Sequence, residues 1–314
     1  MKSARPASFL ALVITVCCAS SVAAEEHEDA RALALGDSVV FGFITQANPE
    51  YVNASNFIGS PEYVAGMLDL DVANAGCPGE ATSSFLSATG ADNGCRAFRA
   101  KFPLHVAYSS TQMAFATSFL QRHRHVRLVT IGIGANDLFI LQEACAKNPN
   151  PQLCIEAGLP VVLATITANM ATILAELRAT GFGGVIVIVN YYSLDYSDLA
   201  GTGVTELLNQ AITAPATAYG AVVADVFTAF QKAVAVVGGK TCSAGLLNVD
   251  PQDLQLKSCD VHPTQSGQRL IAKAITQAYR AASWLSLVGV PPARAAPGPA
   301  PGSHRAKSAR GATA

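Results

Sequence analysis

The sequence predicts an α/β fold in which a parallel sheet is covered by helices on both faces. Short apolar runs rich in Val, Ile and Leu barely alternate with polar residues, which is typical of strands buried on both faces. These runs alternate with amphipathic stretches, the pattern of parallel strands joined by crossover helices. The predicted strands are residues 31–35, 70–75, 126–133, 184–190 and 220–226, and the predicted helices are residues 63–68, 112–121, 160–180, 204–219 and 264–284.

The first three predicted strands each lead into a polar or glycine-containing turn. Residues 31–35 run into Gly36-Asp37-Ser38, residues 70–75 into a loop with two glycines, and residues 126–133 into Gly134. Because ligand sites in such sheets form at the carboxyl ends of the strands, these turns are where we expect functional residues.

Proline and glycine mark the expected ends of two predicted helices. Pro160 suits the first turn of the helix over residues 160–180, and Gly181 suits its C-cap. The last predicted helix opens at His262 and Pro263, where proline fixes the backbone as the helix begins.

Composition limits the range of partners. The chain has 314 residues, of which 50% are hydrophobic and 14% charged, and its net charge is −1. This is enough for one large domain with a sizeable core. The near-neutral charge gives no reason to expect a nucleic-acid partner, and we expect a monomer. Beyond the first residues, no segment is expected to cross a membrane.

The start of the chain has the pattern of a secretory signal peptide over residues 1–24. Lys2 and Arg5 precede an apolar stretch over residues 9–18, and Val22-Ala23-Ala24 offers a cleavage site. A membrane anchor is the alternative, which the shortness of the apolar stretch disfavours. We therefore expect a secreted protein whose folded domain covers residues 25–288.

The end of the chain differs in composition from the rest. Residues 289–314 are rich in Pro, Ala, Gly and Ser and carry basic but no acidic residues. With almost no apolar bulk to bury, they are expected to form a disordered tail. This tail either binds anionic surfaces or is a solvated extension without a role.

The cysteines predict a disulfide-bonded, exported domain. Six of the eight lie beyond the expected signal peptide, and an even number in an exported chain favours disulfides. Six cysteines allow fifteen pairings, but they fall into three local couples. The expected bonds are Cys77–Cys95, Cys145–Cys154 and Cys242–Cys259. A zinc site is disfavoured because no C-x₂-C pair is present.

A serine and a histidine are the candidates for nucleophilic catalysis. Ser38 follows a strand in a tight turn, where its Oγ can stand exposed beside backbone N–H groups. It needs a general base, and His262, beside Asp260, is the best candidate among six histidines. The turn could instead simply cap a helix, since Asp and Ser both favour such positions.

Acyl transfer also needs donors for a negatively charged oxygen. The Ser38 backbone N–H, a glycine N–H after the second strand, and the Asn136 side-chain amide are the candidates. Both Gly76 and Gly79 follow that strand. Asp37 and Asp137 are interpreted as structural residues that orient their loops.

Four short motifs, in this order along the chain, resemble the sequence blocks of the SGNH (GDSL) hydrolase family, and most of all its secreted bacterial lipase/esterase branch with three disulfides. They are Gly36-Asp37-Ser38, Asn74 to Gly79, Gly134-Ala135-Asn136-Asp137 and Asp260-Val261-His262-Pro263. The resemblance implies a flavodoxin-like three-layer α/β/α fold and ester hydrolysis without a metal or other cofactor. By motif position, it implies Ser38 as nucleophile, His262 as base, and Ser38, Gly79 and Asn136 as the oxyanion hole.

The sequence departs from the family pattern at one position. The family's usual acid lies three residues before the histidine, where this chain has Cys259, and Asp260 lies two residues before it. Either Asp260 reaches His262 by a local adjustment of the backbone, or a main-chain carbonyl orients the imidazole.

The expected function is a secreted serine ester hydrolase of the lipase/esterase type, acting on an acyl or lipid ester. Phe41 and Phe43 follow the nucleophile and either line an acyl pocket or belong to the core. The alternatives are a carbohydrate O-acetylesterase and a non-catalytic secreted binding protein on the same scaffold.

Overall fold

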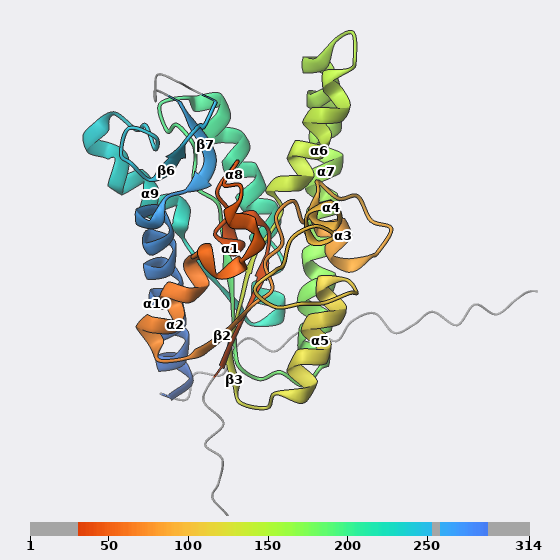
Figure 1. Cartoon of the computed structure of the whole chain (residues 1–314), viewed down its shortest axis with the longest axis vertical. Coiled ribbons are helices and arrows are strands. Elements are labelled where there is room, and N and C mark those ends of the chain that lie inside the picture. The colour runs from red at the N-terminus through yellow and green to blue at the C-terminus, as the bar shows by residue number, and fades with distance from the viewer. Residues whose placement is uncertain (1–30, 253–257, 288–314) are drawn as a thin grey trace, which may run out of the picture.

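A computed structural model describes residues 31–252 and 258–287 and shows a three-layer α/β/α fold (Figure 1). The central sheet has five parallel strands in the order β2-β1-β3-β4-β5, which is the flavodoxin-like order. The predicted parallel sheet is therefore confirmed. Its strands are β1 (Arg31–Gly36), β2 (Asp71–Asn74), β3 (Val126–Gly132), β4 (Val185–Val189) and β5 (Ala221–Ala224).

Helices cover both faces of the sheet because successive strand residues point to opposite sides. On one face, Leu33 and Leu35 pack against helices α5, α7 and α8. On the other face, Ala32 and Leu128 pack against α2, α9 and α10. These helices are α2 (Ser60–Leu68), α5 (Gln112–Arg122), α7 (Pro151–Ala179), α8 (Leu199–Thr213), α9 (Val226–Val234) and α10 (Gln265–Leu287).

The remaining elements are short or lie beyond the sheet's carboxyl end. The α-helices are α1 (Ser38–Phe41), α3 (Thr82–Leu86), α4 (Cys95–Arg99) and α6 (Ala135–Ala146), and the short 3₁₀ helices are η1 (Glu50–Val52), η2 (Ala54–Asn56), η3 (Thr217–Tyr219) and η4 (Ala235–Val237). Strands β6 (Leu247–Val249) and β7 (Cys259–Pro263) form a separate antiparallel pair.

The expected start of the long helix at Pro160 is wrong. Helix α7 begins at Pro151, where the Asn150 side chain accepts a hydrogen bond from the N–H of Leu153. Pro151 and Pro160 are both compatible with the first turn of a helix. The helix begins at Pro151 because the Asn150 side chain caps it there. Pro160 lies inside the helix on its exposed side.

The expected place of His262 at the start of the last helix is also wrong. His262 lies in β7, which pairs with β6 in the register Leu247 to Pro263, and α10 begins only at Gln265. The pairing of β7 with β6 holds the backbone around His262 in an extended conformation, although the sequence motif alone is also compatible with the start of a helix.

The expectation that no segment beyond the first residues could cross a membrane needs correction. By length and composition, α7 passes as a membrane span, and it is the one such helix among the described residues. Its residues Ile166, Met170 and Ile173 are fully buried against the sheet. We therefore interpret α7 as a core helix whose first half extends beyond the body.

The structure contains the disulfides Cys77–Cys95, Cys145–Cys154 and Cys242–Cys259. The first closes the loop that follows β2, the second links α6 to α7, and the third joins β7 to the segment before β6. The expected signal peptide and basic tail lie outside the described residues.

Candidate active site

The turn that carries Ser38 is built by a glycine and a buried aspartate. Gly36 has φ +145°, and a Cβ there would lie 2.0 Å from the carbonyl oxygen of Gly132 on the neighbouring strand, so only glycine fits. The Asp37 side chain accepts a hydrogen bond from the N–H of Val39 at 2.9 Å and caps α1. Ser38 is thereby left half-buried at the first position of this helix.

Asp37 is held from behind by a buried tyrosine. Its second carboxylate oxygen accepts a hydrogen bond from the hydroxyl of Tyr191, at the carboxyl end of β4. Burial raises the pKa of the Asp37 carboxyl to about 6, and the hydrogen bonds from Tyr191 and Val39 limit the rise. Asp37 therefore fixes the turn from the interior, as expected for a structural residue.

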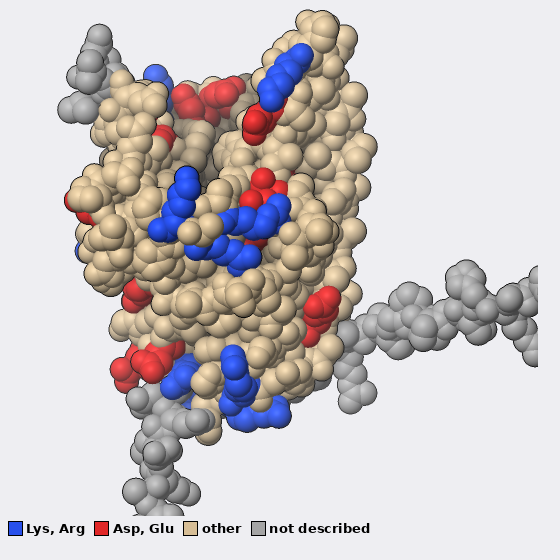
Figure 2. Space-filling view, turned by 45° about the vertical axis from the view of Figure 1, so that its right-hand side comes forward, with Lys and Arg blue, Asp and Glu red and all other residues tan. Residues whose placement is uncertain are grey.

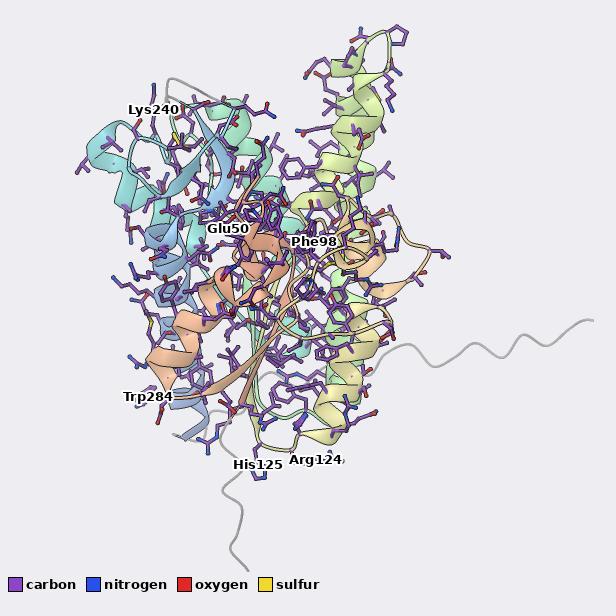
Figure 3. All side chains as sticks on the ribbon, viewed as in Figure 1. Glu50, Phe98, Arg124, His125, Lys240 and Trp284 are labelled. Carbon is purple, nitrogen blue, oxygen red and sulfur yellow. A yellow bond between two sulfur atoms is a disulfide. The ribbon has the colours of Figure 1, made fainter. Side chains whose placement is uncertain are left out.

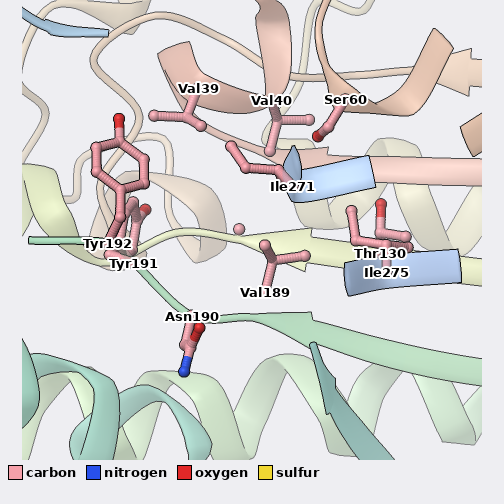
Figure 4. A pocket seen from close by; sticks show the side chains of 11 residues that line it. Val39, Val40, Ser60, Thr130, Val189, Asn190, Tyr191, Tyr192, Ile271 and Ile275 are labelled. Atoms are coloured by element: carbon pink, nitrogen blue, oxygen red, sulfur yellow. The ribbon is translucent and has the colours of Figure 1, made fainter. Parts of the chain in front are cut away.

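Close packing continues behind the turn. Figure 4 shows a gap among Val39, Val40, Tyr191 and Ile271 whose volume is about 10 Å³, which is no more than one water molecule needs. The interior behind the turn is therefore closely packed.

His262 meets Ser38 across the carboxyl end of the sheet. The distance from His262 Nε2 to Ser38 Oγ is 2.9 Å, between residues that lie 224 positions apart in the chain. The ring of Phe43 packs edge-on against the imidazole, with centroids 5.0 Å apart. Phe41, by contrast, is fully buried in an aromatic cluster, so of the two it is the core residue.

The other imidazole nitrogen faces two oxygen atoms. His262 Nδ1 lies 3.3 Å from Asp260 Oδ1 and 3.3 Å from the hydroxyl oxygen of Thr45. Asp260 Oδ1 also accepts the backbone N–H of His262 at 2.6 Å. The structure thus brings Asp260, and no main-chain carbonyl of the described residues, to Nδ1. Nothing near Thr45 in the sequence indicates its contact with His262.

The surroundings of Asp260 favour its charged form. Partial burial opposes ionisation, but hydrogen bonds from His262 and Thr45 outweigh it and hold the pKa of Asp260 below its ordinary value. Its Oδ2 is buried and has no hydrogen-bond partner among the described residues. The carboxylate therefore places a negative charge beside the imidazole at neutral pH.

The loops after β1, β2 and β3 are tied together at the same edge. The N–H of Asp37 donates to the carbonyl of Gly132 at 3.1 Å, and the N–H of Cys77 donates to the carbonyl of Gly36 at 3.0 Å. These bonds hold the turns that carry Ser38, Gly79 and Asn136 side by side at the carboxyl edge of the sheet.

Of the two candidate glycines, Gly79 is the better placed. The N–H of Gly76 already donates to the side chain of Asn74 at 3.0 Å. Gly79 has φ +87°, in the left-handed region, and is half-buried. Asn136 lies near the start of α6, and its Nδ2 donates to the carbonyl oxygen of Glu80 at 2.9 Å. The amide of Asn136 is thus fixed next to the segment that carries Gly79.

Two buried carboxylates brace this segment. Asp137 accepts the backbone N–H of Thr82 at 2.9 Å and its hydroxyl at 2.6 Å. Glu80 accepts hydrogen bonds from the Ser84 hydroxyl and, at 3.2 Å, from the Gln112 side chain.

Gln112 connects these carboxylates to the turn that carries Ser38. Its Nε2 donates to the carbonyl of Gly36 at 3.0 Å, and its Oε1 accepts the N–H of the same residue. Thr45, Glu80 and Gln112 were not identified from the sequence, because their partners are distant along the chain.

Cys77, Glu80 and Cys95 are the one group of possible metal ligands found among the described residues, with ligand atoms within 4.8 Å of one another. The two sulfur atoms are joined in a disulfide, and a metal-binding thiolate is not available from either. We therefore assign no metal to this group.

Replacing Glu80 with glutamine is expected to change how stability depends on pH. Burial, with a further contribution from Asp92, raises the pKa of Glu80 from 4.5 to about 7. The folded protein thus binds this proton more tightly than the unfolded chain does. The resulting stability is complete below pH 4.5 and is lost as the pH rises through about 7. The loss is about 3 kcal/mol.

Urea unfolding at several pH values measures this effect. Glutamine keeps an acceptor for Gln112, so Glu80→Gln should gain stability relative to the wild type as the pH rises from about 5 to about 8. A constant difference between the two proteins over that range would contradict the assignment. Asp92→Asn, which removes the neighbouring charge and also its ion pair with Arg96, should show a smaller pH-dependent change in the same direction.

Comparisons with known proteins agree with this architecture. The model of the GDSL-like lipase/acylhydrolase family matches residues 34–270. The structure of phospholipase A1 from Streptomyces albidoflavus NA297 is similar, with 19% identity, a TM-score of 0.53 and coverage of 80% of this chain and 99% of that one. An acetyl xylan esterase from Geobacillus stearothermophilus has 15% identity, a TM-score of 0.47 and coverage of 86% and 98%.

No curated protein sequence matches significantly. The likeness to the solved structures concerns the fold, whereas the family model spans the motifs at Ser38, Gly79 and Asn136 and also His262. Since it matches most of the chain, the protein belongs to the GDSL-like lipase/acylhydrolase family.

Proposed function

We propose that this protein is a secreted serine ester hydrolase that cleaves acyl or lipid esters. The contact of 2.9 Å between Ser38 Oγ and His262 Nε2 is the observation that supports the proposal most strongly. A hydroxyl within hydrogen-bonding reach of an imidazole, with a carboxylate behind it, is the arrangement that activates a serine as a nucleophile.

In the proposed reaction, Ser38 Oγ attacks the ester carbonyl carbon while His262 Nε2 takes its proton. The negative oxygen of the tetrahedral intermediate accepts hydrogen bonds from the backbone N–H groups of Ser38 and Gly79 and from the Asn136 amide. His262 then protonates the departing alkoxide, which leaves an acyl group on Ser38. Water, activated by His262, attacks this acyl-enzyme, and the acid and free serine are regenerated. Asp260 and Thr45 orient the imidazole.

The surface near the site supports an apolar substrate. Ile44 and Leu194, on segments that follow β1 and β4, are exposed by 41% and 47%, and Leu199 at the start of α8 by 83%. The α6–α7 hairpin rises beyond the body at the same end of the molecule as these segments (Figure 1). The part of α7 that extends beyond the body includes residues 157–165, none of which is charged, and most of the hairpin is uncharged in Figure 2. Aliphatic surface of this kind suits an acyl chain.

An exposed aromatic side chain, Trp284, lies away from the proposed site. Trp284, the only tryptophan of the chain, is 62% exposed. Figure 3 shows it at the opposite end of the molecule from Lys240, toward His125 and Arg124 at the amino end of β3. Large exposed aromatic rings combine an apolar face with a polar edge, which would suit a sugar. Trp284 is therefore not placed to stack on a sugar at Ser38, and the ring beside His262 is the half-buried Phe43.

Covalent trapping tests the reaction class. A fluorophosphonate should label the native protein on one peptide, which contains Ser38, and labelling should disappear after heat denaturation. Label on another residue would contradict the assigned nucleophile. A protein that neither reacts nor hydrolyses any ester would instead be a binding protein on this scaffold.

A series of p-nitrophenyl esters tests the substrate class. Because a longer acyl chain buries more apolar surface, kcat/KM should rise from the acetate to medium or long chains. A preference for acetate alone would favour the carbohydrate O-acetylesterase alternative.

The three disulfides support export, because such bonds persist in oxidising compartments. Protein recovered outside the cytoplasm, beginning at Glu25, would agree with a cleaved signal peptide.

A further inference from the structure

Asn93 contacts both residues outside the turn of Ser38 that supply donors to the proposed oxyanion hole. It belongs to the loop closed by the Cys77–Cys95 disulfide. Its backbone N–H donates to the carbonyl of Gly79 at 2.9 Å, and its side-chain Nδ2 donates to Asn136 Oδ1 at 2.8 Å. One residue thus connects two groups that come from different loops.

The contact with Gly79 is made by the main chain. A Cβ at Gly79 would lie 2.4 Å from the carbonyl oxygen of Asn93 and 2.9 Å from the nitrogen of Cys95. Gly79 therefore packs directly on the Asn93 backbone, and the hydrogen bond to its carbonyl holds the Gly79–Glu80 peptide, which adjoins the peptide that carries the Gly79 N–H. Substitution of the Asn93 side chain leaves this contact in place.

The contact with Asn136 determines the direction in which the oxygen and the nitrogen of its side-chain amide point. Asn136 Oδ1 accepts from Asn93, and Nδ2 donates to the carbonyl of Glu80 at 2.9 Å. A side-chain amide has two N–H donors on its nitrogen, so one remains for the substrate oxygen. If the amide were turned over, its oxygen would face the developing negative charge and would repel it.

We propose that Asn93 is a positioning residue of the oxyanion hole, which holds the Asn136 amide with its nitrogen toward the substrate. The inference rests on the proposed function, since it concerns the stabilisation of the same tetrahedral intermediate. Asn93 itself does not touch the reacting atoms and acts through Asn136.

Asn93→Asp tests the proposal with little change in size. A carboxylate at this position offers only acceptors and repels Asn136 Oδ1. If Asn136 turns over, its oxygen meets the carbonyl of Glu80 instead, so neither orientation is satisfied. We expect kcat to fall about 100-fold, toward the loss found when an oxyanion donor is removed. KM should change by less than about threefold, because the substrate ground state carries no such charge.

Asn93→Ala removes the donor without adding repulsion, so its loss in kcat should be smaller, about tenfold. Asn148→Asp makes the same chemical change at an exposed turn and keeps the acceptor for the N–H of Asn150. Its activity should match the wild type. Circular dichroism and thermal unfolding report whether each variant is folded, and Asn93→Ala provides the test if Asn93→Asp does not fold.

A double-mutant cycle separates positioning from a general structural role. In an Asn136→Ala background, Asn93→Asp should lower kcat by less than about threefold, since the group that it orients is gone. The affinity for a boronic acid, which forms a tetrahedral adduct on Ser38, should fall in parallel with kcat.

Two results would overturn the positioning role while ester hydrolysis by the wild type remains. One is a kcat for Asn93→Asp within about threefold of the wild type, and the other is an equal loss with and without the Asn136 amide. Absence of hydrolysis by the wild type would instead overturn the proposed function itself.

Discussion

Replacing Ser38 with alanine is expected to lower kcat/KM for ester hydrolysis by about 10⁴- to 10⁶-fold. The change removes the oxygen that lies 2.9 Å from His262 Nε2 and that we propose to carry the acyl group. Activity that remains would come from water attacking a substrate still held by the oxyanion donors. The measurement is steady-state hydrolysis of a p-nitrophenyl ester, together with loss of fluorophosphonate labelling.

The fold should survive this substitution. Ser38 is half-buried and its side chain makes no contact in the core, so the free energy of unfolding should change by less than about 1 kcal/mol. Ser110→Ala, at an exposed position before α5, is the matched control and should leave both activity and stability unchanged. Full activity in Ser38→Ala would rule out the assigned nucleophile.

Replacing His262 with alanine should lower kcat/KM by a similar factor, about 10⁴-fold or more. Without the imidazole, nothing at Ser38 takes the proton as the oxygen attacks, and nothing protonates the leaving alkoxide. Fluorophosphonate labelling should slow strongly as well, because that reaction needs the same proton transfer. Unimpaired hydrolysis would show that another group acts as base.

Asp260→Asn provides a graded comparison for the same imidazole. The amide oxygen of asparagine can still accept the backbone N–H of His262, which Asp260 Oδ1 accepts at 2.6 Å. The Thr45 hydroxyl also remains within 3.3 Å of Nδ1. The charge is lost but the Thr45 hydroxyl still faces the ring, so we expect a loss that is smaller than that of His262→Ala.

Steady-state hydrolysis of a p-nitrophenyl ester, measured side by side for Asp260→Asn and His262→Ala, checks this order of effects. A loss as large as that of His262→Ala would mean that Thr45 has no part in orienting the ring.

Short-range chemistry made the sheet and the turn at Ser38 predictable. The apolar runs that became β1 and β3 are buried on both faces, and the predicted strands agree with the observed ones to within two residues. The turn at Ser38 follows from glycine and aspartate preferences that depend on neighbouring residues only. For this reason the turn at Ser38 and the parallel sheet could be predicted from the sequence alone.

Features that depend on distant partners could not be predicted in this way. The pairing of β7 with β6 places His262 in a strand, although proline after the histidine suggested a helix. Thr45 contacts His262 over 217 positions, and Asn93 contacts Asn136 over 43. Side-chain hydrogen bonds of this kind leave no periodic pattern in the sequence.

The way in which Asp260 is anchored has a consequence for recognising related enzymes. Its carboxylate accepts the backbone N–H of His262, so a separation of two residues is geometrically sufficient for the proposed acid and base to meet on an extended segment. A motif search that requires a separation of three residues would pass over such chains. Asp-x-His on an extended segment, preceded by a disulfide-bonded cysteine, is a second spacing by which they can be found.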